Sequence, residues 1–446
     1  MTRNSKSIVA ALLFLVAVVA TTFAQERTLT IEQCLALGLE RDPGLHATRM
    51  EAERASGGLK EARVNLFPKL SVSGTYRRLS NEGASTISVP PGNSVTLGEP
   101  ILNNYSLQTD LEYPVFNGFR VQATLAALQK QTEAAKAQVA HKKAATTLDI
   151  VTAFWKAVEA DRRIAVIEKN LELVEAHLQH VTELRARGVA TQEDVLQTRM
   201  RLSETQLMRI EALSSRDLAH YRLALAIGVP DMEEITLQPE FEKSSVPKGD
   251  LTALIARALG NRNDLFAAQR RIEAAVELQR QAEAAYYPQI IVTGNYSLAR
   301  PNSRIFPPDD SWDDSWAVGI TARIGLSDIA AAPAKTAQAR AREAEARDQA
   351  TQLEDGIRLS VTRAYYNVQT AVKSLDVAET MIAQATESLK VTEEKFKNGI
   401  AKSTDVLSAQ LSLLNAEMEY TNRRIDRELA VAALAMATGE TDELYR

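Results

Sequence analysis

The sequence Arg187-Gly188-Val189-Ala190-Thr191-Gln192-Glu193-Asp194-Val195-Leu196 lies between two long segments with helical patterning. It returns later as Asn398-Gly399-Ile400-Ala401-Lys402-Ser403-Thr404-Asp405-Val406-Leu407, again between two such segments. A constant shift of 211 positions relates the two copies, and the same shift carries Phe154 to Tyr365 and Gly228 to Gly439. Because the shift stays constant over so long a span, we interpret the chain as a duplicated unit.

The long segments predict two antiparallel helical hairpins, at residues 121–227 and 329–438, that turn at these two stretches. From about Val121 to Arg185 nothing breaks the helical pattern, which is about 65 residues, or about 100 Å at 1.5 Å per residue. Apolar residues in this segment follow the heptad spacing of a packed helical seam. They are Ile164, Ile167, Leu171, Val174, Leu178 and Val181.

The composition agrees with long helices and gives little sign of a charged partner. Only 5 % of the 446 residues are aromatic and 24 % are charged, as is typical of helix-rich chains. The formal charge of −5 is mild and argues against nucleic acid as a partner. Cys34 is the only cysteine, so no intramolecular disulfide is possible, and we expect it to be a small core residue.

The amino terminus predicts export. Arg3 and Lys6 precede an apolar run, residues 8–20, and the small-x-small sequence Thr22-Phe23-Ala24 follows. This is the pattern of a signal peptide, residues 1–24, cleaved after Ala24. The apolar run is shorter than the about 20 residues that a membrane-spanning helix needs. Any membrane segment of the mature protein is therefore expected to be of the β type.

Four strands are predicted, at about residues 69–79, 104–113, 289–298 and 316–325, because apolar and polar residues alternate there. About ten residues is the length of a tilted strand that crosses a bilayer. Half-buried strands of soluble proteins alternate in the same way, so the export signal is what favours the membrane interpretation. Polar loops, residues 80–103 and 299–315, connect the strands of each pair.

The predicted organisation has four parts along the chain. The signal peptide, residues 1–24, is followed by a first repeat, residues 25–228, and a second repeat, residues 251–446. Residues 229–250 join the repeats and contain several Pro and Gly residues that break the helical pattern. They form either a plain linker or a small belt on the outside of the helices.

No constellation of catalytic residues is recognisable, so no enzymatic activity, cofactor or metal site is predicted. His177 and His180 are three residues apart on a predicted helix, but no further His or Cys completes a metal site. We expect both to be solvated polar side chains of that helix.

In this arrangement the chain resembles the TolC-type outer-membrane efflux proteins over essentially its whole mature length. The resemblance rests on the order of several motifs: Leu29-Thr30-Ile31-Glu32-Gln33-Cys34-Leu35-Ala36-Leu37, Phe67-Pro68, Tyr113-Pro114-Val115-Phe116-Asn117-Gly118, Tyr287-Pro288 and the two Gly-to-Asp-Val-Leu turns. The second repeat has Gly325-Leu326-Ser327-Asp328 where the family repeats a Pro-aromatic-Asn/Asp-Gly motif, so the bend at this point is not predicted by analogy.

The resemblance implies a mainly α-helical fold with membrane β-structure, in which a homotrimer forms a twelve-stranded β-barrel continuous with an α-helical barrel. Oligomerisation also follows without it, because single-chain barrels need about eight strands and open sheet edges are not tolerated in lipid. The implied function is a passive exit duct of a tripartite efflux pump or type I secretion system. The duct crosses the outer membrane and extends into the periplasm.

The resemblance also implies that the hairpin tips dock a periplasmic adaptor, which links the channel to an inner-membrane transporter. The docking residues are then Gly188, Val189, Asp194, Val195, Leu196, Gly399, Ile400, Asp405, Val406 and Leu407. Asp405 matches the acidic periplasmic gate of the family, although the second acidic position of that gate is Ser408 here. Alternatively, Asp405 only stabilises the first turn of its helix, where an acidic side chain is favourable.

Two other classes of protein remain as alternatives. A periplasmic adaptor has a helical hairpin, but it has one hairpin flanked by β-rich domains, whereas this chain has two hairpins of equal length. A soluble coiled-coil scaffold has no channel, and salt or urea removes it from membranes. Neither the substrate nor the inner-membrane transporter is indicated by any motif of the chain.

Overall fold

A computed structural model describes residues 28–81, 83, 86–90, 92–96, 101–230, 236–241 and 249–441; the predicted signal peptide lies outside these residues. The chain divides into two units, which we describe separately. One unit consists of Met1–Thr48, Val139–Asn263 and Leu353–Arg446, and the other of Arg49–Gln138 and Asp264–Gln352.

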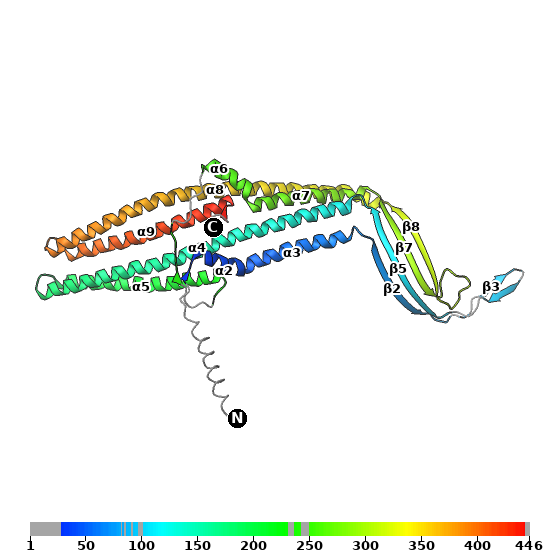
Figure 1. Cartoon of the computed structure of the whole chain (residues 1–446), viewed down its shortest axis with the longest axis horizontal. Coiled ribbons are helices and arrows are strands. Elements are labelled where there is room, and N and C mark those ends of the chain that lie inside the picture. Colours follow the sequence, from blue (N-terminus) through cyan, green and yellow to red (C-terminus); the bar gives the residue numbers. More distant parts are fainter. Residues whose placement is uncertain are drawn as a thin grey trace, which may run out of the picture. The chain divides into compact units, whose positions relative to one another are not determined.

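The unit that contains Arg49–Gln138 is built around a four-stranded antiparallel sheet (Figure 1). Its strands are β2 (Lys69–Arg78), β5 (Asn103–Phe116), β7 (Gln289–Arg300) and β8 (Asp313–Arg323), in the order β2-β5-β7-β8. Apolar residues of neighbouring strands face each other in the register, so the predicted alternation gives the sheet one apolar and one polar face. Examples are Leu70 with Leu111, Leu107 with Leu298, and Val292 with Ile320.

The strand register reproduces the duplication. Gly74 pairs with Leu107 in the first repeat, and Gly294 pairs with Val318 in the second. The loop between β2 and β5 contains a further two-stranded hairpin, β3 (Thr86–Val89) and β4 (Asn93–Thr96), where only a polar loop was expected.

Helices continue from the sheet on the same unit. At the first strand-to-helix bend, Gly118 has φ +67°, and a Cβ there would lie 2.7 Å from the carbonyl oxygen of Ala284. Only glycine fits this position, since both the backbone conformation and the close approach exclude a side chain. The second strand-to-helix bend lacks the family motif. There the Ile329 N–H donates to the Gly325 carbonyl, and this bond begins the next helix.

The helices that form the two hairpins are α4 (Arg120–Ala186) with α5 (Gln192–Ala226), and α8 (Leu326–Lys397) with α9 (Ser403–Thr438). Shorter helices precede them in each repeat: α2 (Ile31–Arg41) and α3 (Pro43–Val64), then α6 (Leu251–Asn261) and α7 (Asn263–Glu283). Among the described helices, none combines the length and the apolar character of a membrane-spanning segment.

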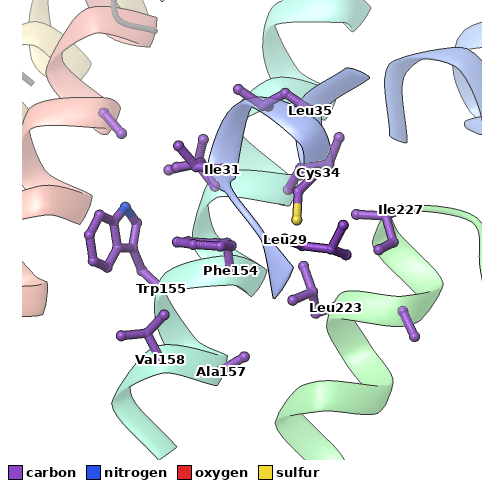
Figure 2. Close-up of a cluster of buried hydrophobic side chains, with 14 of the residues drawn as sticks. Leu29, Ile31, Cys34, Leu35, Phe154, Trp155, Ala157, Val158, Leu223 and Ile227 are labelled. Atoms are coloured by element: carbon purple, nitrogen blue, oxygen red, sulfur yellow. The ribbon is translucent and has the colours of Figure 1, made fainter. Parts of the chain in front are cut away.

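The hydrophobic core of the unit that contains Val139–Asn263 joins α2, α4, α5 and α9 (Figure 2). Phe154 and Trp155 of α4 are its largest buried side chains, and their rings pack edge to face, with centroids 5.5 Å apart. Cys34 is fully buried in this core, as predicted. Burial, and to a lesser extent the Glu32 carboxylate, raises the pKa of its thiol to about 12.

Residues 236–241, a described part of the segment between the repeats, contact this core. Its strand β6 (Thr236–Leu237) pairs in parallel with β1 (Thr28–Leu29), which precedes α2. The Phe241 ring lies 5.0 Å from the Trp155 ring and 3.7 Å below the guanidinium of Arg424 on α9. These contacts place Thr236, Leu237 and Phe241 against the helices.

The buried seam of α4 differs from the predicted one by two positions. The buried residues are Ile164, Ile167, Asn170, Val174, His177 and Val181, whereas Leu171 and Leu178 are only half-buried. The reason is that α4 packs against α9 of the second hairpin as well as against α5, as in the cluster of Ile164, Ala212 and Leu414. Heptad spacing within one helix does not report this second contact.

Candidate functional site

Each hairpin tip is a tight turn built on a glycine in the left-handed conformation. Gly188 has φ +76° and Gly399 has φ +71°. After each glycine the chain bonds back to the end of the preceding helix: the Val189 N–H donates to the Leu184 carbonyl at 2.9 Å. The Ile400 N–H donates to the Lys395 carbonyl at 2.8 Å. These are glycine C-caps, so the two turns are equivalent in structure as well as in sequence.

The aspartates of the two tips cap the returning helices. At the start of α5 the Thr191 N–H donates to the Asp194 carboxylate at 2.9 Å, and the Asp194 N–H donates to the Thr191 hydroxyl at 3.1 Å. Hydrogen bonds from Thr191 hold the pKa of Asp194 below its ordinary value. At the start of α9 the Lys402 N–H donates to the Asp405 carboxylate at 2.9 Å. The Lys402 side chain has no acceptor atom, so this cap is only half of a capping box.

The predicted docking residues divide into exposed and buried ones. Val189 and Ile400 are 70 % and 75 % exposed, and Leu196 is also exposed. By contrast, Val195 and Val406 are fully buried within the hairpins, and Leu407 is half-buried. The inclusion of Val195 and Val406 in a docking surface was therefore wrong, because their side chains point into the helical packing that supports the tips.

Near the tips the two hairpins contact each other through buried polar side chains. The Nε2 atom of His177 on α4 lies 2.9 Å from the hydroxyl of Ser403, the first residue of α9. The ring of Phe396 on α8 packs against both His177 and His180. Two turns further from the tips, the Asn170 amide donates to the Gln410 carbonyl, and the Gln410 amide donates to the Leu173 carbonyl.

His177 is therefore not the solvated side chain that was predicted, since only 7 % of it is exposed. Burial is the main cause that lowers its pKa to about 4, so its ring is neutral at neutral pH. The described residues contain no group of three or more His, Cys, Asp or Glu side chains placed to hold a metal ion.

The sheet has a second feature with functional meaning, an apolar face exposed on the single chain. Trp316, Val318 and Ile320 of β8 are each about 70 % exposed, and Leu70, Val72 and Leu107 continue the same face. Exposed apolar surface of this extent marks contact with a membrane or another protein. The outer edges of β2 and β8 are also unpaired within the described part of the chain.

A sequence model described as outer membrane efflux protein matches residues 35–229 and 254–440 of the chain. The chain belongs to this family. The family consists of channel proteins, and this member is a channel component of efflux systems in the outer membrane. The predicted family, fold class, general function and location are thereby confirmed.

Individual family members are similar to the chain over most of its length. The outer membrane protein OprJ of Pseudomonas aeruginosa is 21 % identical over 412 residues, which cover 90 % of this chain and 82 % of OprJ. TolC of Escherichia coli is 20 % identical over 410 residues, with coverage of 90 % and 80 %. The efflux protein BepC of Brucella suis is 24 % identical over 333 residues, with coverage of 74 % and 71 %.

Two solved structures, of CusC and of the outer membrane protein VceC, have the same fold. The CusC structure superposes with a TM-score of 0.78 at 15 % identity and covers 94 % of this chain and 95 % of CusC. The structure of VceC from Vibrio cholerae gives a TM-score of 0.75 at 19 % identity, with coverage of 92 % and 96 %.

Sequence reasoning missed the polar contact between the hairpins of this efflux protein. The three-residue spacing of His177 and His180 was the only signal of it, and that spacing does not reveal a partner 226 positions away. The buried amides Asn170 and Gln410 gave no signal, because single polar residues within long charged helices are common.

Proposed function

We propose that three copies of this chain close into one channel, and that the hairpin tips at its periplasmic end dock an adaptor of an inner-membrane transporter. The observation that carries the proposal is the sheet, which has an exposed apolar face and two unpaired edges. In lipid such edges must be paired, because no water is present to satisfy their N–H and C=O groups.

The strand order supports closure by identical copies. Four antiparallel strands place β2 and β8 in opposite directions at the two edges, so β8 of one copy can pair antiparallel with β2 of the next. Three copies then supply twelve strands, an even number within the range of known outer-membrane barrels. The polar faces of the strands line an aqueous passage, and transport through it is passive.

The tips carry the features of a docking surface. Val189 and Ile400 expose apolar side chains on the two turns, and Leu196 exposes one near the start of α5. A glycine and an aspartate cap fix the conformation of each turn. Apolar anchors on a rigid frame lose little conformational entropy on binding. A periplasmic adaptor is the partner that the family supplies for this position. In the proposed trimer, three copies of Asp405 form the acidic gate that the resemblance to the family implies.

Single cysteines on the two sheet faces test the channel. Cysteines at the polar positions should react with a membrane-impermeant thiol reagent, whereas those at Leu107, Val292 and Ile320 should be protected by lipid. The polar positions are Ser71, Ser73, Ser106, Gln108, Thr293 and Thr321. The native Cys34 can stay, since its buried thiol with a raised pKa gives no background.

Equal labelling of both sets of cysteines would overturn the proposal. Extraction of the protein from membranes by urea would favour the coiled-coil scaffold in its place. Cross-linking of β8 to β2 of a second copy, with a trimer on gel electrophoresis, is the matching positive result.

A further inference from the structure

We propose that the contact of His177 with Ser403 and Phe396, called here the tip contact, is a pH-sensitive device that holds the two hairpins of one chain together. Protonation of His177 releases it. Separation of the two hairpins does not depend on the proposed trimeric channel. An increase in the conductance of that channel at low pH does rest on the proposed function.

The tip contact joins three helices from the two hairpins. His177 comes from α4, Phe396 from the end of α8 and Ser403 from the start of α9. The histidine and the serine are 7 % and 3 % exposed, and the centroids of the His177 and Phe396 rings are 5.2 Å apart. A proton added to the imidazole would therefore place a charge in a buried site, against the Phe396 ring and the Ser403 hydroxyl.

The charged groups around His177 offer little compensation for that charge. His180, one turn along α4, disfavours protonation, whereas Asp194 of α5 favours it. The Asp194 carboxylate is already held by Thr191 and lies in the field of Lys402. From α8 and α9 the groups that touch the ring are uncharged, and the neighbouring charged side chains are exposed: Lys395, Lys397, Lys402 and Asp405.

Polar atoms in the seam behind the tip contact lower the free-energy cost of separating the hairpins. Three buried polar atoms have no hydrogen-bond partner among the residues that the structure describes: Asn170 Oδ1, Gln410 Oε1 and His180 Nε2. Each such atom costs free energy in the closed seam and regains a hydrogen bond to water when the hairpins separate. An apolar seam at these positions would have no comparable gain on opening.

The direction of the pH effect follows from the two states of His177. In the closed contact burial lowers its pKa to about 4, and in separated hairpins the pKa returns to about 6.5. The closed contact is therefore fully favoured above pH 6.5 and loses stability as the pH falls toward 4, because only the separated form binds the proton. Between pH 7 and pH 5 the ratio of separated to closed hairpins rises about 20-fold per chain.

Spin labels on the two tips test the inference. Val189→Cys and Ile400→Cys place labels at exposed positions, and the label-to-label distances are measured in the isolated protein by electron paramagnetic resonance. In the otherwise native chain, the long-distance population should grow about 20-fold relative to the short one between pH 7 and pH 5. In His177→Gln, which keeps a hydrogen-bond donor but does not titrate, the ratio of the long-distance to the short-distance population should be the same at pH 7 and pH 5.

The controls separate a local effect from a general effect of acid. His46→Gln removes an exposed histidine of α3 and should keep the full pH response. If His177→Gln does not fold, Ser403→Ala replaces it and should raise the separated population at pH 7 while retaining a response to pH. An unchanged distance distribution between pH 7 and pH 5, or an equal response in His177→Gln, would overturn the inference.

Conductance in planar bilayers then distinguishes this inference from the proposed function. Hairpin separation together with increased conductance at pH 5 supports both. Hairpin separation without any conductance supports the tip contact and refutes the proposed closure of three copies into one channel. A channel whose tip distances do not respond to pH refutes the tip contact alone.

Discussion

Replacement of Gly399 by valine should disrupt the second hairpin tip while leaving the rest of the protein intact. Among the described residues, no heavy atom outside the turn lies within 4 Å of the position that a Cβ would take, so the cost comes from the backbone alone. A non-glycine residue at φ +71° costs about 1–3 kcal/mol, and a β-branched side chain lies in the upper half of that range. A cost of about 2 kcal/mol lowers the population of the native turn about 30-fold relative to open forms.

Hydrogen exchange of the Ile400 amide measures this change directly. In the native turn that amide donates to the Lys395 carbonyl at 2.8 Å, and this bond is lost when the turn opens. We expect its protection to fall about 30-fold in Gly399→Val, with weaker copurification of the adaptor and unchanged trimers on gel electrophoresis. Gly188→Val should do the same at the first tip, where the Val189 amide is the reporter.

Gly356→Ala is the matched control, because Gly356 lies in the middle of α8 and a Cβ there also meets nothing within 4 Å. Its backbone is helical, so alanine should stabilise that position by about 0.5–1 kcal/mol and leave both tips unaffected. Undiminished protection of Ile400 in Gly399→Val would refute the requirement for a positive φ. Equal loss of protection in Gly356→Ala would show that the effect is not local to the turn.

Three further substitutions test the gate and the core. Asp405→Ala removes the bond from the Lys402 N–H and should cost about 0.5–1 kcal/mol; it should also relieve any block by periplasmic cations in planar bilayers. If Asp194→Ala changes the block and Asp405→Ala does not, the gate lies on the first hairpin. Trp155→Ala removes the largest buried side chain of the core in Figure 2. It should lower the free energy of unfolding by about 3–5 kcal/mol, measured by thermal unfolding. An unchanged melting temperature would contradict the packing there.

The sequence predicted what depends on local periodicity and on the duplication. The Gly-to-Asp stretches, the strand alternation and the proline stops each report on a few neighbouring residues, and the structure has helices and strands at those places. It did not predict that Asn170 and His177 replace Leu171 and Leu178 in the buried seam, because α9 lies more than 200 positions away. For the same reason Val195 and Val406 were expected at the surface, although both are covered by packing between helices.

The pairing of β5 with β7 connects the two repeats of one chain. It predicts the register of the strand pair between copies, β8 of one copy with β2 of the next. By the duplication β8 corresponds to β5, and β2 corresponds to β7. The β8–β2 pair between neighbouring copies should therefore repeat the register of the β5–β7 pair within the chain. Leu111 faces Gly294, and Thr109 faces Tyr296. The corresponding pairs are Ala322 with Gly74 of the next copy, and Ile320 with its Tyr76. The proposed trimer is then a ring of six nearly equivalent pieces, which a shorter ancestor with one repeat could have closed as a hexamer.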